Sequence, residues 1–349
     1  MKKNSGINIK KIAQLTGVDP STVSRALNGS RLVKSETRER IEKTAKENGY
    51  IRDSLAKSLI VGKTNTLGIL VPEISSTFYS RIVHEIEDMV GKNNYGIILA
   101  ATNYSYLNEK KGLNEMLSKR VDALVFCTAS EQILQDYRDL RAPSPLVLCD
   151  TIWEDIPYDN VYVDEKTGIL KAVQYLVKIG HREISFIAEQ NLTLRRLDIF
   201  ARVMHECGQR LNKTFLLSEP SLDSECGYAG MKRLLKVRQR PTAIICARDT
   251  IAIGAMRAAS ESGVRIPGDM SIIGYDDINV AKYLYPALTT IRQPSDEIGR
   301  NVGEIVLHRL RAKTRVDSFF KVTIIPELVI RESAGPPKKN SKYRTHGIC

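Results

Sequence analysis

The spacing of apolar residues changes near residue 63 of this 349-residue chain. Before that point, apolar residues recur every three or four positions, a spacing that predicts short amphipathic helices. After it, short unbroken apolar runs alternate with helix-like segments, which is typical of buried parallel strands separated by helices. Two such strand–helix arrays follow one another. The pattern therefore predicts an all-α head joined to an α/β core with two similar lobes and parallel sheets.

Residues 8–28 predict two short helices joined by a tight turn. Asn8 is a favourable N-cap for the first helix, and Gly17 ends it because glycine adopts the left-handed conformation at little cost. Asp19 caps the second helix, and Pro20 occupies its first position, where the missing N–H costs nothing. The predicted buried faces consist of Ile9, Ile12, Ala13 and Leu15 in the first helix and of Val23, Ala26 and Leu27 in the second. This arrangement is a helix-turn-helix.

The exposed face of the second helix carries small polar groups and one arginine, which suit entry into a DNA major groove. The candidate DNA contacts are Pro20, Ser21, Thr22, Ser24, Arg25 and Asn28. An ordinary αα-hairpin in a protein that never binds DNA has the same geometry, so these two helices alone leave both interpretations open. A third helix is predicted from Glu36 to Asn48, with Ser35 as its cap and Gly49 at its end.

Charge is distributed unevenly along the chain, whose net charge is +12. Residues 1–63 carry 14 Lys or Arg and 6 Asp or Glu, a net charge of +8, and residues 331–349 contribute +4. The long middle segment is therefore close to neutral. A basic head on a neutral body is the electrostatic pattern of a DNA-binding module fused to another domain.

Several motifs occur in the order that one protein family shows. They are Ile9-Lys-Lys-Ile-Ala13, Val18-x-x-x-Thr-Val-Ser-Arg25, Gly49-Tyr50, Ala56-Lys-Ser-Leu59, Thr66-Leu-Gly-Ile-Leu70, Gly180-His-Arg182, Ile273-Gly-Tyr-Asp-Asp277 and Leu288-Thr-Thr-Ile-x-Gln-Pro294. Over about residues 7–335 the chain thus resembles the lactose/galactose-repressor (LacI/GalR) family of bacterial transcription regulators.

This resemblance implies a division of the chain into four parts. They are a helix-turn-helix domain (1–52), a hinge helix and linker (53–63), a two-lobed periplasmic-binding-protein-like core (64–330) and a tail (331–349). Three chain crossovers are expected between the lobes, with lobe one at about 64–160 and 289–318 and lobe two at about 161–288 and 319–330. The tail has no apolar periodicity, so we expect it to be disordered.

The resemblance also implies a repressor that binds double-stranded operator DNA as a homodimer and responds to a small-molecule effector held between the lobes. The hinge helix is expected to fold on DNA, where Lys57 faces a phosphate and Leu59 wedges into a minor-groove step. Arg52 stands where the family usually has a proline.

Candidate effector contacts lie beyond the carboxyl ends of predicted strands, where ligands of open α/β sheets bind. Phe78 and Tyr79 follow the first core strand and could stack on a sugar or base ring, or could simply pack the loop. Arg196 can donate paired hydrogen bonds to hydroxyls, a carboxylate or a phosphate. Asp276 ends another strand and can accept hydrogen bonds from hydroxyls or amines.

By resemblance, these four residues match effector contacts of the family. The family's motif at the arginine normally reads Arg-Leu-x-Gly-Phe/Trp, and its glycine is missing from Arg196-Leu-Asp-Ile-Phe200. Leu222 and Arg248 occupy further matching positions. Asp164 follows a strand and is a weaker candidate, because an aspartate there could just cap the next helix. A sugar or sugar derivative is the favoured effector, while a purine or a phosphorylated ligand stays open.

Catalytic motifs are absent from the sequence, which has no nucleotide-binding glycine fingerprint, no G-x-S-x-G elbow and no H-E-x-x-H motif. We therefore expect no enzyme activity, no cofactor and no metal. Cys127, Cys149 and Cys246 belong to apolar strand-like runs and are expected to be small core residues without disulfides.

The expected location is the bacterial cytoplasm, at the nucleoid. No apolar run approaches the roughly 20 residues of a membrane helix, and the first residues, Met1-Lys-Lys-Asn-Ser5, lack a signal-peptide segment. The alternatives are a solute-binding protein of the same fold without a regulatory role, and a sugar-phosphate enzyme. The basic head argues against the first, and the missing catalytic base argues against the second.

Overall fold

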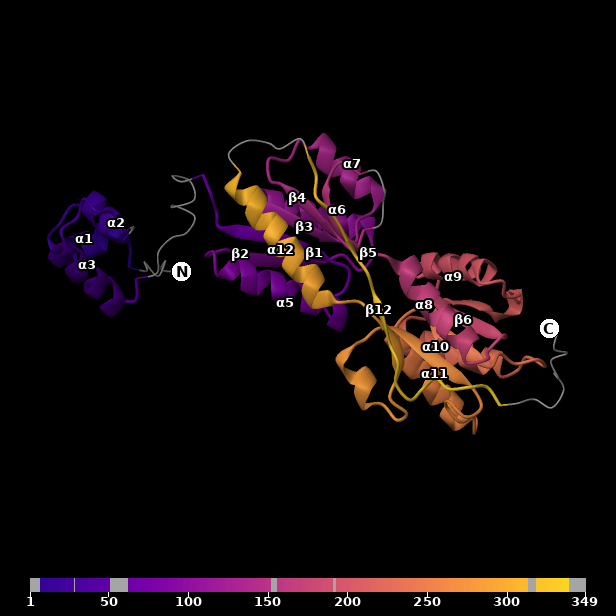
Figure 1. Ribbon diagram of the computed structural model, residues 1–349. Coiled ribbons are helices and arrows are strands. Elements are labelled where there is room, and N and C mark those ends of the chain that lie inside the picture. Colours follow the sequence, from indigo (N-terminus) through magenta and orange to yellow (C-terminus); the bar gives the residue numbers. More distant parts are fainter. Residues whose placement is uncertain are drawn as a thin grey trace, which may run out of the picture. The chain divides into compact units, whose positions relative to one another are not determined.

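The structure, a computed structural model, describes residues 7–27, 29–50, 62–151, 156–190, 193–312 and 318–338. The chain forms two compact units, Met1–Thr64 and Asn65–Cys349, and Figure 1 labels their elements. Three of the predicted DNA contacts, Asn28, Lys57 and Leu59, lie outside the described residues, as does the predicted hinge helix. Those expectations remain predictions.

The head contains three helices, α1 (Ile9–Thr16), α2 (Pro20–Leu27) and α3 (Ser35–Glu47). The predicted caps of the first two helices are confirmed. The Asn8 side chain accepts a hydrogen bond from the Lys11 amide at 3.0 Å, Gly17 has a φ of +65°, and the Asp19 carboxylate accepts one from the Ser21 amide at 2.8 Å. The head encloses a small core formed by Ile12, Ala13, Val23, Ala26, Leu27, Val33, Ile41 and Ala45.

Two local predictions in the head are wrong. Leu15 is 50% exposed, because the apolar stripe of a helix follows positions i, i+3, i+4 and i+7 from Ile9, and the last of these is Thr16. The buried Thr16 hydroxyl donates to the Ile12 carbonyl at 2.7 Å, so its polar atom is satisfied. Ser35 is the first residue of α3 rather than its cap, and its hydroxyl donates to the Glu39 carboxylate instead.

The core contains two six-stranded sheets, one in each lobe, as the unbroken apolar runs predicted. In lobe one the order is β11 (Lys321–Ile324), β5 (Asp159–Val163), β4 (Leu146–Cys149), β3 (Ala123–Cys127), β1 (Thr66–Val71) and β2 (Gly96–Ala101). In lobe two it is β12 (Glu327–Val329), β10 (Thr289–Arg292), β9 (Ser271–Asp276), β8 (Ala243–Cys246), β6 (Ile184–Glu189) and β7 (Leu216–Glu219). All pairings are parallel except that of β10 with β12.

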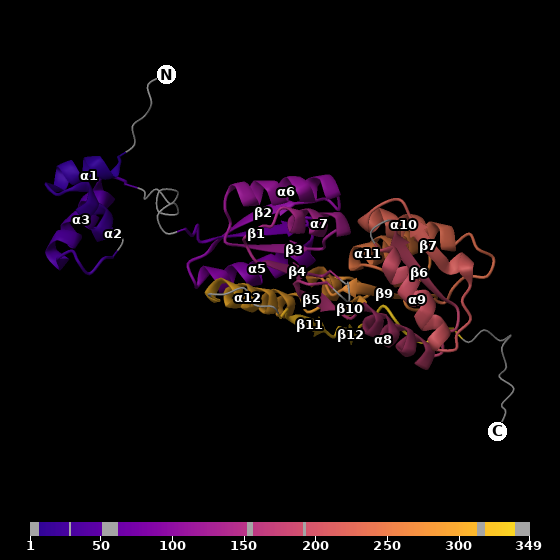
Figure 2. The ribbon, with the colours of Figure 1, turned by 90° about the horizontal axis from the view of Figure 1, so that it is seen from above.

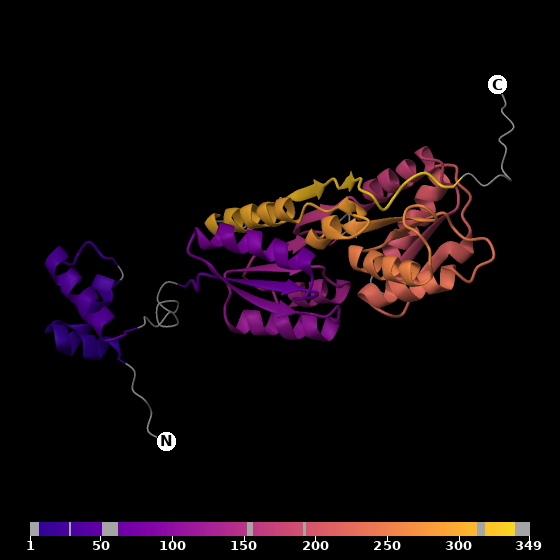
Figure 3. The same ribbon diagram turned by 90° about the horizontal axis from the view of Figure 1, so that it is seen from below.

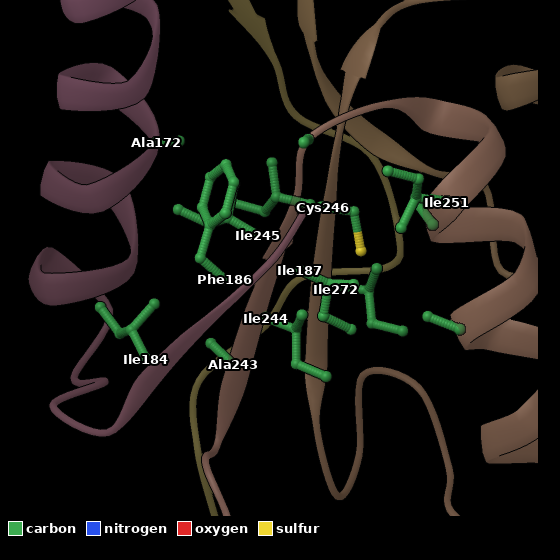
Figure 4. Packing of buried hydrophobic residues seen from close by; sticks show 14 of the residues in the cluster. Ala172, Ile184, Phe186, Ile187, Ala243, Ile244, Ile245, Cys246, Ile251 and Ile272 are labelled. Carbon is green, nitrogen blue, oxygen red and sulfur yellow. The ribbon is translucent and has the colours of Figure 1, made fainter. Parts of the chain in front are cut away.

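Helices cover both faces of each sheet, which explains why the strands are apolar without alternation. In lobe one, α5 (Thr77–Gly91) and α12 (Ser295–Arg311) cover one face, and α6 (Tyr106–Ser118) and α7 (Glu131–Asp139) cover the other (Figure 2). In lobe two the helices are α8 (Glu165–Lys178), α9 (Leu194–Glu206), α10 (Asp223–Leu234) and α11 (Asp249–Glu261). Figure 4 shows Ala172 of α8 beside Phe186, and Ile251 of α11 beside Cys246.

Three crossovers join the lobes, but the predicted lobe boundaries are wrong by several residues. The chain passes between lobes at Asp164, at 293–294 and at 325–326, because β5 and β11 pair within lobe one while β10 and β12 pair within lobe two. Figure 3 shows the segment from β11 to β12 running along both lobes. Strand pairing joins residues far apart in sequence, so a local apolar pattern does not reveal which sheet a strand enters.

The predicted disorder of the tail is wrong for its first part, residues 331–338. Ser333 is fully buried, and its hydroxyl donates to the Ile272 carbonyl at 2.6 Å. The imidazole of His181 lies 2.9 Å from the Gly335 carbonyl oxygen and 2.8 Å from the Thr242 hydroxyl. These contacts satisfy the backbone of a segment that has no apolar periodicity of its own.

The three strand cysteines, Cys127, Cys149 and Cys246, are fully buried core residues, as predicted. None of the helices in the described ranges is long and apolar enough to cross a membrane.

Candidate functional site

A cavity of about 160 Å³ lies between the lobes, at the carboxyl ends of the strands. It is lined by Phe78, Tyr79, Tyr104, Thr128, Asp150, Glu165, Glu189, Thr193, Arg195, Arg196, Arg248, Asp276 and Gln293. Five of the seven effector contacts expected from the sequence are among them. Lobe one supplies the residues up to Asp150, and lobe two supplies the charged residues from Glu165 to Asp276.

The aromatic pair sits where β1 leads into α5. The hydroxyl of Ser76 caps that helix, and the rings of Phe78 and Tyr79 meet edge to face with centroids 5.0 Å apart. Both rings are mostly buried and pack against the core of lobe one. The Tyr79 hydroxyl donates to the Asp150 carboxylate at 3.0 Å. The two residues therefore line the cavity and pack the loop at the same time.

Arg196 is the most constrained cation of the cavity. Its Nε donates to Glu165 at 2.8 Å and its Nη1 donates to the Ala247 carbonyl at 2.6 Å. Its guanidinium carbon lies 3.9 Å from the ring centroid of Tyr275, a cation–π geometry. Burial raises the pKa of Glu165, but the guanidinium groups of Arg196 and Arg195 outweigh burial and hold that pKa below its usual value.

Asp276 is held in the cavity by an unusual backbone conformation at the end of β9. Its φ of +116° is one that L residues rarely adopt, and such conformations cluster at functional sites. The Gln293 amide donates to its Oδ1 at 2.6 Å, and Arg196 Nη1 lies 3.9 Å from the same oxygen. Burial raises the pKa of Asp276, while Arg196 and Arg248 act against that shift.

Arg248 precedes α11 and lies among three carboxylates. The nearest nitrogen–oxygen distances are 3.5 Å to Glu73, 3.6 Å to Glu189 and 3.5 Å to Asp223. Glu73 follows β1 in lobe one, so its ion pair with Arg248 joins the two lobes.

Asp150 is the carboxylate that follows β4, and its pKa is shifted upwards. Burial raises its pKa to about 6, and the negative charge of Glu165 adds to the increase. Arg196 and the hydrogen bond from Tyr79 act in the opposite direction. The group therefore titrates close to neutral pH.

Two expected contacts do not line the cavity. Leu222 is half exposed at the start of α10. Asp164 accepts hydrogen bonds from the Thr167 amide at 3.0 Å and from the Thr167 hydroxyl at 2.6 Å, so it caps α8, which was its alternative role.

Eight lining residues were missed by sequence reasoning: Tyr104, Thr128, Asp150, Glu165, Glu189, Thr193, Arg195 and Gln293. For three of them a usable signal existed. Thr128 and Asp150 directly follow apolar strands, and Glu189 ends one, which is where ligands of open sheets bind. Within the described ranges, no cluster of His, Cys, Asp and Glu could hold a metal ion.

The candidate DNA face of the head is the outer side of α2. Pro20, Ser21 and Arg25 are exposed, while Thr22 and Ser24 are half-buried. The loop that follows is held by Arg38 of α3, whose Nη2 donates to the Ser30 carbonyl at 2.7 Å.

Comparison with known proteins agrees with both units. Residues 8–53 match the bacterial regulatory proteins of the lacI family, and residues 173–334 match the periplasmic binding protein-like domain. The chain is 34% identical over 328 residues to the ribose operon repressor of Haemophilus influenzae, covering 93% of this chain and 98% of that relative. The chain belongs to the LacI family.

Other relatives of this LacI-family chain support the same assignment. The transcriptional repressor PurR of Vibrio cholerae is 32% identical over 329 residues, with 93% of this chain and 97% of the relative covered. A LacI-family regulator from Enterococcus faecium with bound ribose is 26% identical, with a TM-score of 0.68 over 78% of this chain and 100% of that chain.

The likeness to the lac repressor dimer bound to operator concerns the fold. The TM-score is 0.85 over 95% of this chain and 100% of that chain, at 24% identity. The LacI-family chain is thus a transcription regulator with a helix-turn-helix head and a two-lobed ligand-binding core.

Proposed function

We propose that this regulator is a repressor whose affinity for operator DNA is set by a small neutral sugar bound between its lobes. The observation that carries the proposal is the pairing of charges in the cavity. Arg195 and Arg196 both pair with Glu165, and Arg248 lies among three carboxylates. A phosphorylated ligand binds best where cations are unpaired, whereas sugar hydroxyls both donate and accept hydrogen bonds.

The size and the walls of the cavity support a small ring. Its volume of about 160 Å³ lies below the roughly 300–1,000 Å³ of sites for drug-sized ligands. Phe78 and Tyr79 offer apolar surface for one side of a sugar ring, while Asp150 and Asp276 offer acceptors for its hydroxyls.

A purine base is the second candidate effector. Two adjacent aromatic rings at the cavity suit stacking on a base, and one group of relatives bears the name PurR. Against it, the ribose operon repressor is another relative and a related regulator contains bound ribose.

The proposed DNA complex is a homodimer on a pseudo-palindromic operator, formed in the cytoplasm. Each α2 reads one half-site in the major groove, with Pro20, Ser21, Thr22, Ser24 and Arg25 toward the DNA. Asn28, Lys57 and Leu59 complete the proposed contacts on the strength of the family resemblance. The relatives named above are regulators of transcription, and the proposal assigns no catalytic step to this chain.

Effector binding is proposed to act through the relative orientation of the lobes. A ligand that contacts both lobes favours the closed arrangement, because only there does it make all its contacts. The inter-lobe pair of Glu73 and Arg248 would favour the same arrangement. DNA affinity then changes by the coupling free energy between the two sites.

The test begins with calorimetric titration of the full-length protein with D-ribose, other neutral pentoses and hexoses, D-ribose 5-phosphate, hypoxanthine and guanine. We expect one neutral sugar to bind and to change the retardation of a palindromic operator fragment. If a purine binds and no sugar does, the effector is the second candidate, a purine base. Sugar binding without any DNA retardation would indicate a solute-binding protein instead.

A further inference from the structure

The cavity contains buried polar atoms that lack a hydrogen-bond partner. In the described part of the core, Glu189 Oε2 and Gln293 Oε1 belong to lining residues. A third such atom, Tyr275 Oη, belongs to the residue whose ring contacts the Arg196 guanidinium. The great majority of buried polar atoms in proteins are paired, so each exception needs an explanation. A ligand whose hydroxyl groups donate to the oxygens of Glu189 and Gln293 would satisfy them.

Glu189 is the acidic member of this group and the last residue of β6. Its side chain is fully buried, and Oε1 accepts the backbone N–H of Asp223 at 2.7 Å. The amide of Glu189 itself donates to the hydroxyl of Thr193, another lining residue, at 2.8 Å. One carboxylate oxygen therefore holds the start of α10, while the other has no donor.

We infer that Glu189 is a specificity-determining residue whose Oε2 accepts a hydrogen bond from one hydroxyl of the effector. This inference rests on the proposed sugar effector and narrows its class. A buried carboxylate oxygen without a donor attracts a hydroxyl and repels a phosphate or carboxylate. The positive charge of Arg248, which lies near Glu189, does not offset that repulsion of an anionic ligand, because Arg248 also faces Glu73 and Asp223.

The alternative is that Glu189 serves only to cap α10. Glu219 provides a matched control for that possibility, because it is the register partner of Glu189 on the neighbouring strand β7. It is also a mostly buried acid at a strand end, but its Oε1 pairs with Arg233 at 3.0 Å and it does not line the cavity.

The experiment compares four full-length proteins: wild type, Glu189→Gln, Glu189→Ala and Glu219→Gln. Glu189→Gln keeps an oxygen that can accept from the Asp223 amide but replaces the free oxygen with a donor. Calorimetry measures binding of D-ribose, or of the neutral sugar that binds best, and of each of its monodeoxy analogues. Thermal melting without ligand reports any structural damage.

We expect Glu189→Gln to weaken sugar binding by about 10- to 100-fold, the value of a hydrogen bond to a charged group. One deoxy analogue should bind the wild type more weakly than the parent sugar does, by a similar factor. With Glu189→Ala the same analogue should bind almost as well as the parent sugar, since the loss of the hydroxyl and the loss of the carboxylate remove the same hydrogen bond. Glu219→Gln should bind like the wild type, and D-ribose 5-phosphate should bind the wild type more weakly than D-ribose.

Three results would overturn the inference. The first is that both Glu189 variants bind the sugar as tightly as the wild type does; the proposal of a sugar effector would then still stand. The second is that every deoxy analogue loses the same factor in affinity, relative to the parent sugar, with the wild type and with Glu189→Ala. The third is tighter binding of the phosphorylated sugar. Failure of every neutral sugar to bind the wild type rejects the sugar effector itself, together with this inference.

Discussion

Replacement of Asp150 by asparagine should stabilise the ligand-free core at neutral pH and remove part of its pH dependence. The pKa of Asp150 is about 6, against an ordinary value of 3.8. The folded state thus binds this proton more tightly than the unfolded chain does. As a result, this group makes the core less stable as the pH rises from about 4 to about 6, and the loss persists at higher pH.

The size of the effect follows from the shift of 2.2 pKa units, the difference between 6 and 3.8. At about 1.36 kcal/mol per unit, the upper limit is about 3 kcal/mol. Asp150 borders the cavity rather than lying in the closed core, so solvent reduces this figure, and we expect about 1–3 kcal/mol. For a domain of this size that corresponds to roughly 2–10 °C in melting temperature.

Melting of Asp150→Asn and wild type should be compared at pH 4.5 and at pH 7.5 without ligand. The variant should be the more stable protein at both values, but the separation at pH 4.5 should be only about a third of that at pH 7.5, because most of the loss occurs between the two values. A constant separation at both values, or a less stable variant at pH 7.5, would refute the argument. Sugar affinity of the wild type should also fall as the pH drops through about 6, because a protonated Asp150 accepts fewer hydrogen bonds from hydroxyls.

Three further predictions concern other parts of the chain. Arg25→Ala should lose about 1–3 kcal/mol of operator discrimination while keeping salt-sensitive non-specific binding. If retardation assays show that the affinities for operator and for non-specific DNA fall equally, Arg25 is a phosphate contact. Arg196→Ala and Asp276→Ala should each abolish the ligand response and leave DNA binding largely intact, and unchanged effector affinity in calorimetry would remove them from the site. In Gly227→Ala, the new Cβ would lie 1.7 Å from the Ile251 carbonyl oxygen, so denaturant titration should show a loss of about 3 kcal/mol or more.

The sequence determined the local elements because their signals act over a few residues. Asn8, Gly17 and Asp19 set the ends of α1 and the start of α2 through capping hydrogen bonds to residues at most four positions away. The unbroken apolar runs predicted two parallel sheets covered on both faces. Residues such as Phe78 could be placed at the site because the end of a parallel strand is a local feature.

Only the tertiary structure decided how distant segments combine. Arg248 meets Glu73, which is 175 residues away, and the tail is held by His181, which is 154 residues from Gly335. The assignment of β10 and β11 to their lobes likewise depends on strand pairing rather than on composition. The free oxygen of Glu189 is visible only once its neighbours are in place, because hydrogen-bond satisfaction is a property of the folded surroundings and not of a residue type.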